Sequence, residues 1–206
     1  MKQTALVIFA VLATLLLGAG QSYANGITYT LSDASVTGSI GGTSFTDASV
    51  SITFTGNTSN VSLLSPGTYT NTLGTATVNI SGVGSFAFTD SLGAYVNQGN
   101  ENAGIYDLTE SGAVVLLTHN PSFATYGLTS SIGPITGASI ISSGLSLGTT
   151  DGLLIFNSDS GSSTFTATAV VPEPNCLALF GTGLAGLAMV RRRRQAWGRA
   201  PLFPGV

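Results

Sequence analysis

The stretch Ala48-Ser-Val-Ser-Ile-Thr-Phe-Thr55 alternates strictly between apolar and hydroxyl side chains. Successive side chains of a β-strand point to opposite faces, so this period of two predicts a strand with one buried face. Residues 27–32, Ile-Thr-Tyr-Thr-Leu-Ser, repeat the pattern. Gly41-Gly42 lies between the two stretches and is typical of the turn of a β-hairpin. The chain therefore begins its folded part with paired antiparallel strands.

Further strand candidates follow at intervals of about 8 to 12 residues, a spacing typical of all-β folds. They are residues 36–40, 76–80, 83–88, 105–108, 113–117, 152–156 and 164–170. Residues 114–117 and 153–156 lack alternation, which predicts strands covered on both faces. Pro121 to Tyr126 could form one helical turn, and no stretch predicts an amphipathic helix. We expect an all-β fold, a single antiparallel β-sandwich or jelly-roll-like domain over residues 25–170; a β-solenoid is the alternative, without a repeat of 20 to 50 residues to support it.

The composition of the same region excludes several classes of protein. Residues 25–171 hold eight Asp and Glu and no Lys or Arg, and 24 Ser, 24 Thr and 20 Gly stand among these 147 residues. Hydroxyl residues and glycine favour strands and turns over helices. A net charge near −8 repels nucleic acid and anionic lipid, so neither is an expected partner. The length matches one domain.

Residues 1–24 have the organisation of a secretory signal peptide. Lys2 precedes the uncharged stretch Ala5 to Leu17, and the small residues Ser22 and Ala24 suit a signal peptidase, which would leave Asn25 as the new N-terminus. An N-terminal membrane anchor is the alternative, but this run of thirteen uncharged residues is short for a span.

The C-terminal region combines a proline motif, an apolar segment and a basic cluster. Val171, Pro172, Glu173 and Pro174 precede the uncharged residues 176–190, and a helix must begin after the second proline. Fifteen residues reach about 22 Å, which spans the inner membrane only marginally. The stop-transfer residues are Arg191, Arg192, Arg193 and Arg194. Because basic clusters stay cytoplasmic, everything before Pro174 is expected on the periplasmic side, with residues 195–206 as a cytoplasmic tail.

This order of elements over residues 171–194 resembles the PEP-CTERM sorting signal of Gram-negative bacteria. The resemblance implies that a membrane-embedded exosortase cleaves near Pro-Glu-Pro and frees residues 25–170 for the cell surface or the extracellular space. It also implies that this chain is the substrate and supplies no catalytic group. The twelve residues 195–206 extend beyond the usual end of the signal and leave its C-terminal boundary open.

Residues 25–171 offer few groups for catalysis. They contain one histidine, His119, and no cysteine, so we expect no enzyme activity, no zinc site and no cofactor. Asp107 and Glu110 could pair as glycosidase acids, but spacing along the chain cannot establish their separation. Oxygen-rich residues 97–102 and 157–161 could favour calcium without matching an EF-hand loop. Tyr69, Tyr95, Tyr106 and Tyr126 lie near expected loops and could stack on sugars or belong to the core.

These observations favour an exported structural protein of the cell surface or extracellular matrix. The family resemblance implies association with exopolysaccharide or biofilm, with exosortase and signal peptidase as processing partners. A secreted polysaccharide-binding module, with or without calcium, is the second hypothesis, and a secreted glycoside hydrolase is the third.

Overall fold

A computed structural model describes residues 26–109 and 112–170. This part of the chain is all-β, as the sequence predicted, and its only helices are the 3₁₀ turns η1 (Thr58–Asn60) and η2 (Pro121–Phe123). The strands are β1 (Gly26–Ile40), β2 (Thr43–Asn57), β3 (Val61–Ser65), β4 (Thr68–Asn71), β5 (Gly74–Ile80), β6 (Gly84–Ala87), β7 (Leu92–Asn97), β8 (Asn102–Asp107), β9 (Ala113–His119), β10 (Ile132–Ile141), β11 (Ser146–Thr149), β12 (Gly152–Ser158) and β13 (Ser162–Ala169). Within these two ranges no helix has the length and apolar character that a membrane crossing requires.

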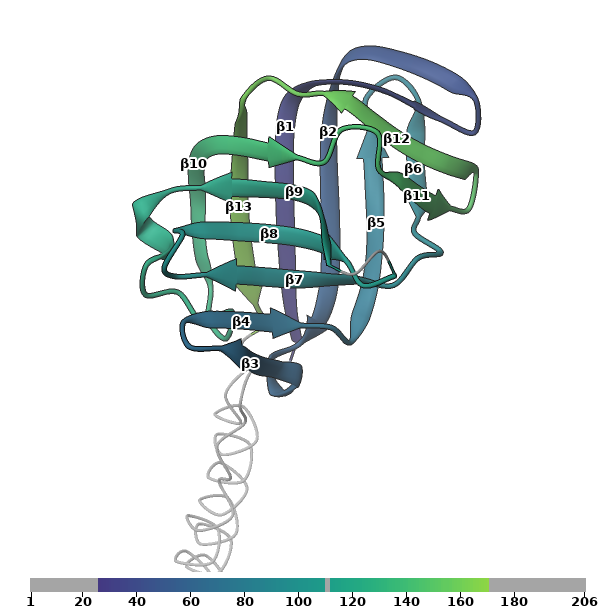
Figure 1. Ribbon diagram of the computed structural model, residues 1–206. Helices are drawn as coiled ribbons and strands as arrows, with labels where there is room; N and C mark the ends of the chain where they lie inside the picture. The colour runs from purple at the N-terminus through teal and green to yellow at the C-terminus, as the bar shows by residue number, and fades with distance from the viewer. Residues whose placement is uncertain (1–25, 110–111, 171–206) are drawn as a thin grey trace, which may run out of the picture. The chain divides into compact units, whose positions relative to one another are not determined.

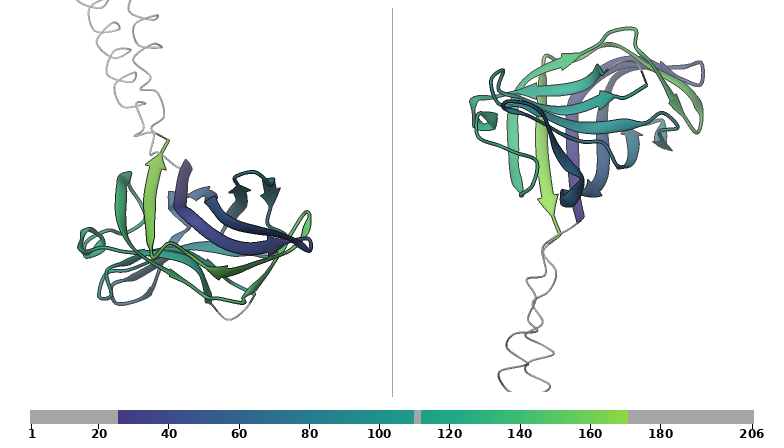
Figure 2. Two further views of the ribbon diagram at one scale, coloured as in Figure 1. Left: turned by 90° about the horizontal axis from the view of Figure 1, so that it is seen from above. Right: turned by 60° about the horizontal axis from the view of Figure 1, so that its bottom comes forward.

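The strands form one antiparallel sheet of thirteen strands, in the order β3-β4-β7-β8-β9-β10-β13-β1-β2-β5-β6, with β12 paired to β1 and β11 to β12. Figure 1 shows β7, β8 and β9 running across β13, β1 and β2, and the view from above shows two layers (Figure 2). Contacts of β7 with β2 and β5, and of β8 and β9 with β1, join these layers. The core lies between them.

Two long strands carry the sheet from one layer to the other. β1 pairs with β13 through Asp33 and with β12 from Thr37 onward, with register shifts between Asp33 and Gly38 where it changes partner. In β10, Ala138 pairs with both β13 and β9. The antiparallel all-β prediction is confirmed; the two layers are parts of one continuous sheet, because strands that bend at bulges can belong to both.

The predicted alternation sets the buried face of β1 and β2. Tyr29 and Phe54 are fully buried, and their rings lie 6.2 Å apart, centroid to centroid. Phe165 from β13 lies 6.3 Å from Tyr29 on the other side. The predicted hairpin is also confirmed: Gly41 and Gly42 connect β1 and β2 with φ of 54° and 85°. A two-residue turn with both φ positive matches the twist of paired strands and favours glycine.

Other local predictions need correction or refinement. Of the apolar run at residues 114–117 in β9, Val115 to Leu117 are buried, as predicted, and Val114 is partly exposed. In β12, Leu153 is 56% exposed beside the buried Leu154. β11 and β1 flank β12 within the sheet, and the face of β12 that carries Leu153 is exposed among the described residues. Residues 36–40 are the second half of β1 and not a separate strand, and β3, β4, β7, β10 and β11 had no predicted counterpart.

The two ends of the described part lie side by side. The backbone N–H of Val170 donates to the carbonyl oxygen of Gly26 over 2.8 Å, and Ala169 pairs with Ile27. β13 lies between β10 and β1, so the sheet requires the chain as far as Ala169. The expected signal peptide, sorting motif and membrane span fall outside the described residues.

Candidate functional site

Two cavities share the β3–β4 hairpin, whose neighbouring residues Leu63 and Leu64 contribute to one cavity each. The side chains of these leucines are 60% and 69% exposed, and the strand that carries them contains no charged residue. Large apolar side chains at the rim of a cavity are typical of binding surfaces. The two cavities beside the hairpin are therefore the candidate ligand-binding sites of the domain.

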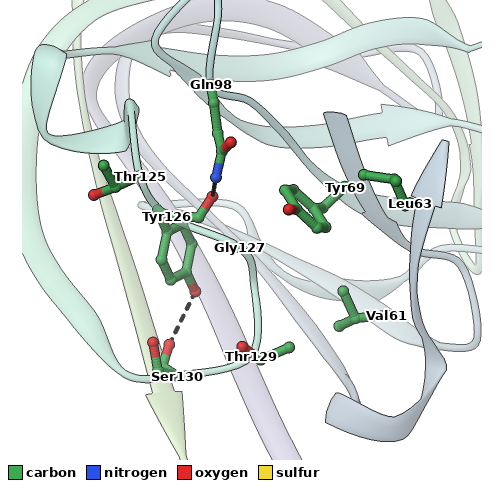
Figure 3. Close-up of a pocket in the computed structure, with 9 residues that line it drawn as sticks. All are labelled: Val61, Leu63, Tyr69, Gln98, Thr125, Tyr126, Gly127, Thr129 and Ser130. Atoms are coloured by element: carbon green, nitrogen blue, oxygen red, sulfur yellow. Dashed lines mark hydrogen bonds between the residues drawn. The ribbon is translucent and has the colours of Figure 1, made fainter. Parts of the chain in front are cut away.

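The first cavity, here the hairpin pocket, measures about 390 Å³. It is lined by Val61, Leu63, Tyr69, Gln98, Tyr126 and Thr129 together with neighbouring residues of the loop from 125 to 130. Figure 3 shows Tyr69 and Tyr126 on opposite sides of this pocket, with Gln98 above them. The pocket thus lies between the hairpin and that loop.

Three hydrogen bonds hold the loop wall of the hairpin pocket. Gln98 Nε2 donates to the carbonyl oxygen of Tyr126 over 2.9 Å, and Tyr126 Oη donates to that of Ser130 over 3.0 Å (Figure 3). From the core, Tyr29 Oη donates to the carbonyl oxygen of Leu128 over 2.6 Å. Leu128 has φ of 62° and is fully buried. This left-handed conformation is costly for leucine and is held by burial, so the wall is pre-formed.

The side chain of Tyr126 is buried in the loop wall of the hairpin pocket. It is 5% exposed, and its ring packs edge-on against Phe165 at 5.9 Å. Burial raises the pKa of its phenol strongly, with the nearby Tyr29 adding to the increase. Because the Tyr126 side chain is almost fully buried, Tyr69 is the more accessible of the two tyrosine rings that line the hairpin pocket.

The second cavity, here the tyrosine groove, lies on the outer side of the layer of β7, β8 and β9 and measures about 460 Å³. It is lined by Leu64, Tyr95, Asn102, Tyr106, Leu117 and Ile140, among others. The register places Tyr95 opposite Gly104 and Tyr106 opposite Gly93. The two tyrosine rings meet edge to face, 5.7 Å apart with an interplanar angle of 65°. Both tyrosines thus belong to strands and not to loops.

The glycines opposite the two tyrosines allow two close approaches, that of the Tyr106 ring to Gly93 and that of β9 to Gly104. A Cβ on Gly93 would lie 2.9 Å from Cε1 of Tyr106, which is closer than side chains pack. A Cβ on Gly104 would lie 2.2 Å from the carbonyl oxygen of Leu116. The ring of Tyr106 therefore lies down over the sheet, where a larger neighbour would push it away. Glycine in a strand often marks such a close approach.

A histidine orients the polar end of the groove. His119 Nδ1 lies 3.0 Å from the carbonyl oxygen of Asn100 and 2.9 Å from Oδ1 of Asn102. Because both partners are oxygens, Nδ1 carries the hydrogen and donates. The amide nitrogen of Asn102 is then left to face other groups. His119 itself is exposed at the end of β9 and acts on the groove through Asn102.

Two of the acidic residues, Asp33 and Asp107, serve the fold. Asp107 is fully buried, and its Oδ1 accepts from the backbone N–H of Thr109 over 2.8 Å. Asp33 is 1% exposed, and its Oδ1 accepts from Ser35 and from the Ser160 hydroxyl over 3.0 and 2.7 Å. Asp107 therefore lines neither cavity, and its expected glycosidase partner Glu110 lies outside the described residues. Among residues 26–109 and 112–170, no three acidic or histidine side chains come close enough to hold a metal ion.

The site residues expected from the sequence lie beyond the described ranges. They are Val171, Pro172, Glu173 and Pro174 of the sorting motif, Arg191 to Arg194 of the basic cluster, and Ser22, Ala24 and Asn25 of the signal peptidase site. In the sequence, the proline motif begins two residues after Ala169, the last residue of β13. An all-β domain followed at once by such a motif has the organisation of an exported protein processed at the membrane.

The comparison with protein families names the motif. Residues 170–194 match the PEP-CTERM protein-sorting motif. The chain is a PEP-CTERM sorting domain-containing protein, and the motif indicates export, a membrane-anchored precursor and exosortase processing. No curated protein and no solved structure matches the chain.

Sequence reasoning named the four tyrosines without finding how they group. The structure brings Tyr95 together with Tyr106 and places Tyr69 across from Tyr126. The alternation Ala94-Tyr95-Val96 is a signal that could have indicated an outward tyrosine on a strand, although no strand was predicted there. It did not reveal which glycine of the next strand lies opposite, because only the register between strands decides that.

Proposed function

We propose that the chain is a noncatalytic protein of the cell surface or extracellular matrix, delivered by the exosortase route and associated with exopolysaccharide. The observation that carries the proposal is the junction between Ala169 and the sorting motif at residues 170–194. Cleavage near Pro172 to Pro174 removes no strand of the sheet. The released protein would keep its complete core, both cavities and a net negative charge that favours solubility.

Processing is tested in a host that contains an exosortase. The intact chain should give way to a released form whose C-terminus lies near Pro172 to Pro174, as measured by mass spectrometry. Glu173→Gln should make uncut precursor accumulate in the membrane, since folding of the β-domain does not depend on that residue. Glu101→Gln, the same change in a turn of the domain, is the matched control and should be processed normally. An uncut C-terminus at the cell surface would contradict the proposal.

A polysaccharide-binding module is the second candidate, supported by the paired rings of Tyr95 and Tyr106. Aromatic rings supply contact area for sugars, and neighbouring amides supply hydrogen bonds. A glycan array run with and without calcium separates a binding module from an inert structural protein. Binding that is unchanged by calcium is the expected result.

A secreted glycoside hydrolase is the third candidate, and the position of Asp107 speaks against it. Hydrolysis of a glycoside needs two carboxyl groups facing the sugar across a cleft, whereas Asp107 faces the core. We therefore propose no catalytic residue. Incubation with the glycans that the array identifies should leave their chain lengths unchanged.

A further inference from the structure

We propose that the tyrosine groove binds a sugar ring of an uncharged glycan, through Tyr95, Tyr106 and Asn102. This inference rests on the proposed association with exopolysaccharide and names the site and the ligand class. The groove of about 460 Å³ falls within the range of about 300–1,000 Å³ typical of small-ligand sites.

The rings of Tyr95 and Tyr106 form a corner suited to a pyranose. With 65° between their planes, one ring offers a face where the other offers an edge. The apolar C–H face of a sugar packs on an aromatic face, while its hydroxyl groups point outward to hydrogen-bond partners. The Tyr106 phenol, whose ordinary pKa of 10.0 burial raises further, is protonated at neutral pH and has a hydrogen to donate.

The amide of Asn102 supplies directional polar contact beside the rings. Its Oδ1 is held by His119 Nδ1 at 2.9 Å, which fixes the orientation of the side chain and turns Nδ2 away from the histidine. A sugar hydroxyl can accept from that nitrogen. A polar group whose orientation is already fixed loses little freedom when the ligand binds.

Charge selects an uncharged glycan over an acidic one. None of the described residues that line the groove is charged. Residues 25–171 contain eight acids and no Lys or Arg. A uronate would meet no cation in the groove and would be repelled by the surrounding domain.

The apolar rim favours the same occupant. Leu64 is 69% exposed and Ile140 41% exposed on either side of the rings. A glycan lying along the groove would cover part of both side chains and gain from their removal from water. The hairpin pocket offers less, because Tyr126 is buried in its wall and only Tyr69 is left to stack.

Calorimetric titration of the full chain tests the proposal. The chain is produced in a host without an exosortase and kept in lauryldimethylamine oxide, a detergent whose head group contains no sugar. Because this protein is unprocessed, failure of glycan binding and failure of exosortase processing are separate results. The probes are neutral hexasaccharides of glucose, mannose and galactose, and hexagalacturonate as the acidic counterpart of equal length.

At least one neutral hexasaccharide should bind, and hexagalacturonate should bind at least tenfold more weakly. Tyr95→Ala and Tyr106→Ala should each weaken binding about tenfold, and Asn102→Ala severalfold, while Tyr95→Phe keeps the ring and most of the affinity. Tyr69→Ala, which truncates a tyrosine of the hairpin pocket, is the matched control and should leave affinity unchanged. Thermal melts identify any variant that fails to fold, and the milder Tyr95→Phe and Asn102→Ala then carry the comparison.

Several results would overturn the proposal. One is that no neutral probe gives a heat of binding, and another is that the acidic probe binds with equal affinity. A third is that Tyr69→Ala loses binding while Tyr95→Ala retains it. Sedimentation could instead show a dimer that Leu64→Asp abolishes. If no glycan binds as well, the groove would be assigned to a second copy of the chain.

Discussion

Replacing Tyr29 by phenylalanine should flatten the loss of stability of the β-domain at alkaline pH. Tyr29 is fully buried between Phe54 and Phe165, and its hydroxyl donates to the carbonyl oxygen of Leu128 over 2.6 Å. Burial raises the pKa of its phenol from 10.0 to about 12, and a hydrogen bond with Asn71 offsets part of the increase. The folded domain therefore holds this proton when the unfolded chain has lost it.

The sign and size of the effect follow from that pKa. A group whose pKa is raised on folding contributes stability that is fully present below its unfolded pKa and is lost as pH rises through its folded pKa. The loss should therefore begin near pH 10 and continue through pH 12. Two pKa units correspond to about 2.7 kcal/mol of the free energy of unfolding. Tyr126, whose pKa burial also raises, adds a loss in the same direction.

Denaturant unfolding of residues 25–170 between pH 8 and 12, followed by circular dichroism, measures the losses of stability that Tyr29 and Tyr126 cause. Tyr29→Phe should be less stable at pH 8 by about 1–3 kcal/mol, because the buried carbonyl of Leu128 loses its donor. It should then lose less stability between pH 10 and 12 than the unmodified domain does. Tyr126→Phe should reduce the alkaline loss as well. If Tyr29→Phe loses stability as steeply as the unmodified domain over this range, the reasoning is wrong.

Three further predictions concern other parts of the chain. Changing Arg191 to Arg194 to Gln removes the stop-transfer charges, and some uncut chains should reach the periplasm; unchanged membrane retention on fractionation would contradict this. Phe165→Ala, which truncates a fully buried ring 5.4 Å from Phe123, should lower the free energy of unfolding by about 3–5 kcal/mol, and a loss under about 1 kcal/mol in denaturant would show that the core closes over the gap. Glu101→Gly relieves φ of 56° in the turn between β7 and β8 and should raise the free energy of unfolding by up to about 1 kcal/mol, detectable as a higher melting temperature; a lower one would show that the turn is unstrained.

The buried faces of the long strands could be predicted from the sequence alone. The alternation at residues 27–32 and 48–55 is local, because neighbouring side chains of any strand point to opposite faces. The unbroken apolar run in β9 likewise predicted burial on both faces. The run in β12 predicted the same, but Leu153 is exposed within the part of the chain that the structure describes. The local sequence shows that both faces of a strand are apolar enough to be buried. It does not show whether another element packs on them.

Strands with weak local patterns depended on their neighbours. β7, Leu92-Gly-Ala-Tyr-Val-Asn97, has few strongly strand-forming residues and was not predicted. It forms between β4 and β8, which supply hydrogen-bond partners along both of its sides. β4 and β11 have four residues each, too few to show a period. Their conformation follows from pairing, which is a property of the sheet.

The sequence by itself determined the all-β class, the absence of basic residues from the domain and the sorting motif, which family comparison confirms at residues 170–194. Such a motif can be recognised from its linear order because its elements are consecutive in the chain. Only the tertiary structure decided that Tyr95 meets Tyr106, whose ring lies close to Gly93, and that Leu64 lines the same groove. The physical reason is that cavities arise from the register and layer packing between strands, and a shift of one residue in the register of β7 or β8 would turn the tyrosine of that strand to the other face.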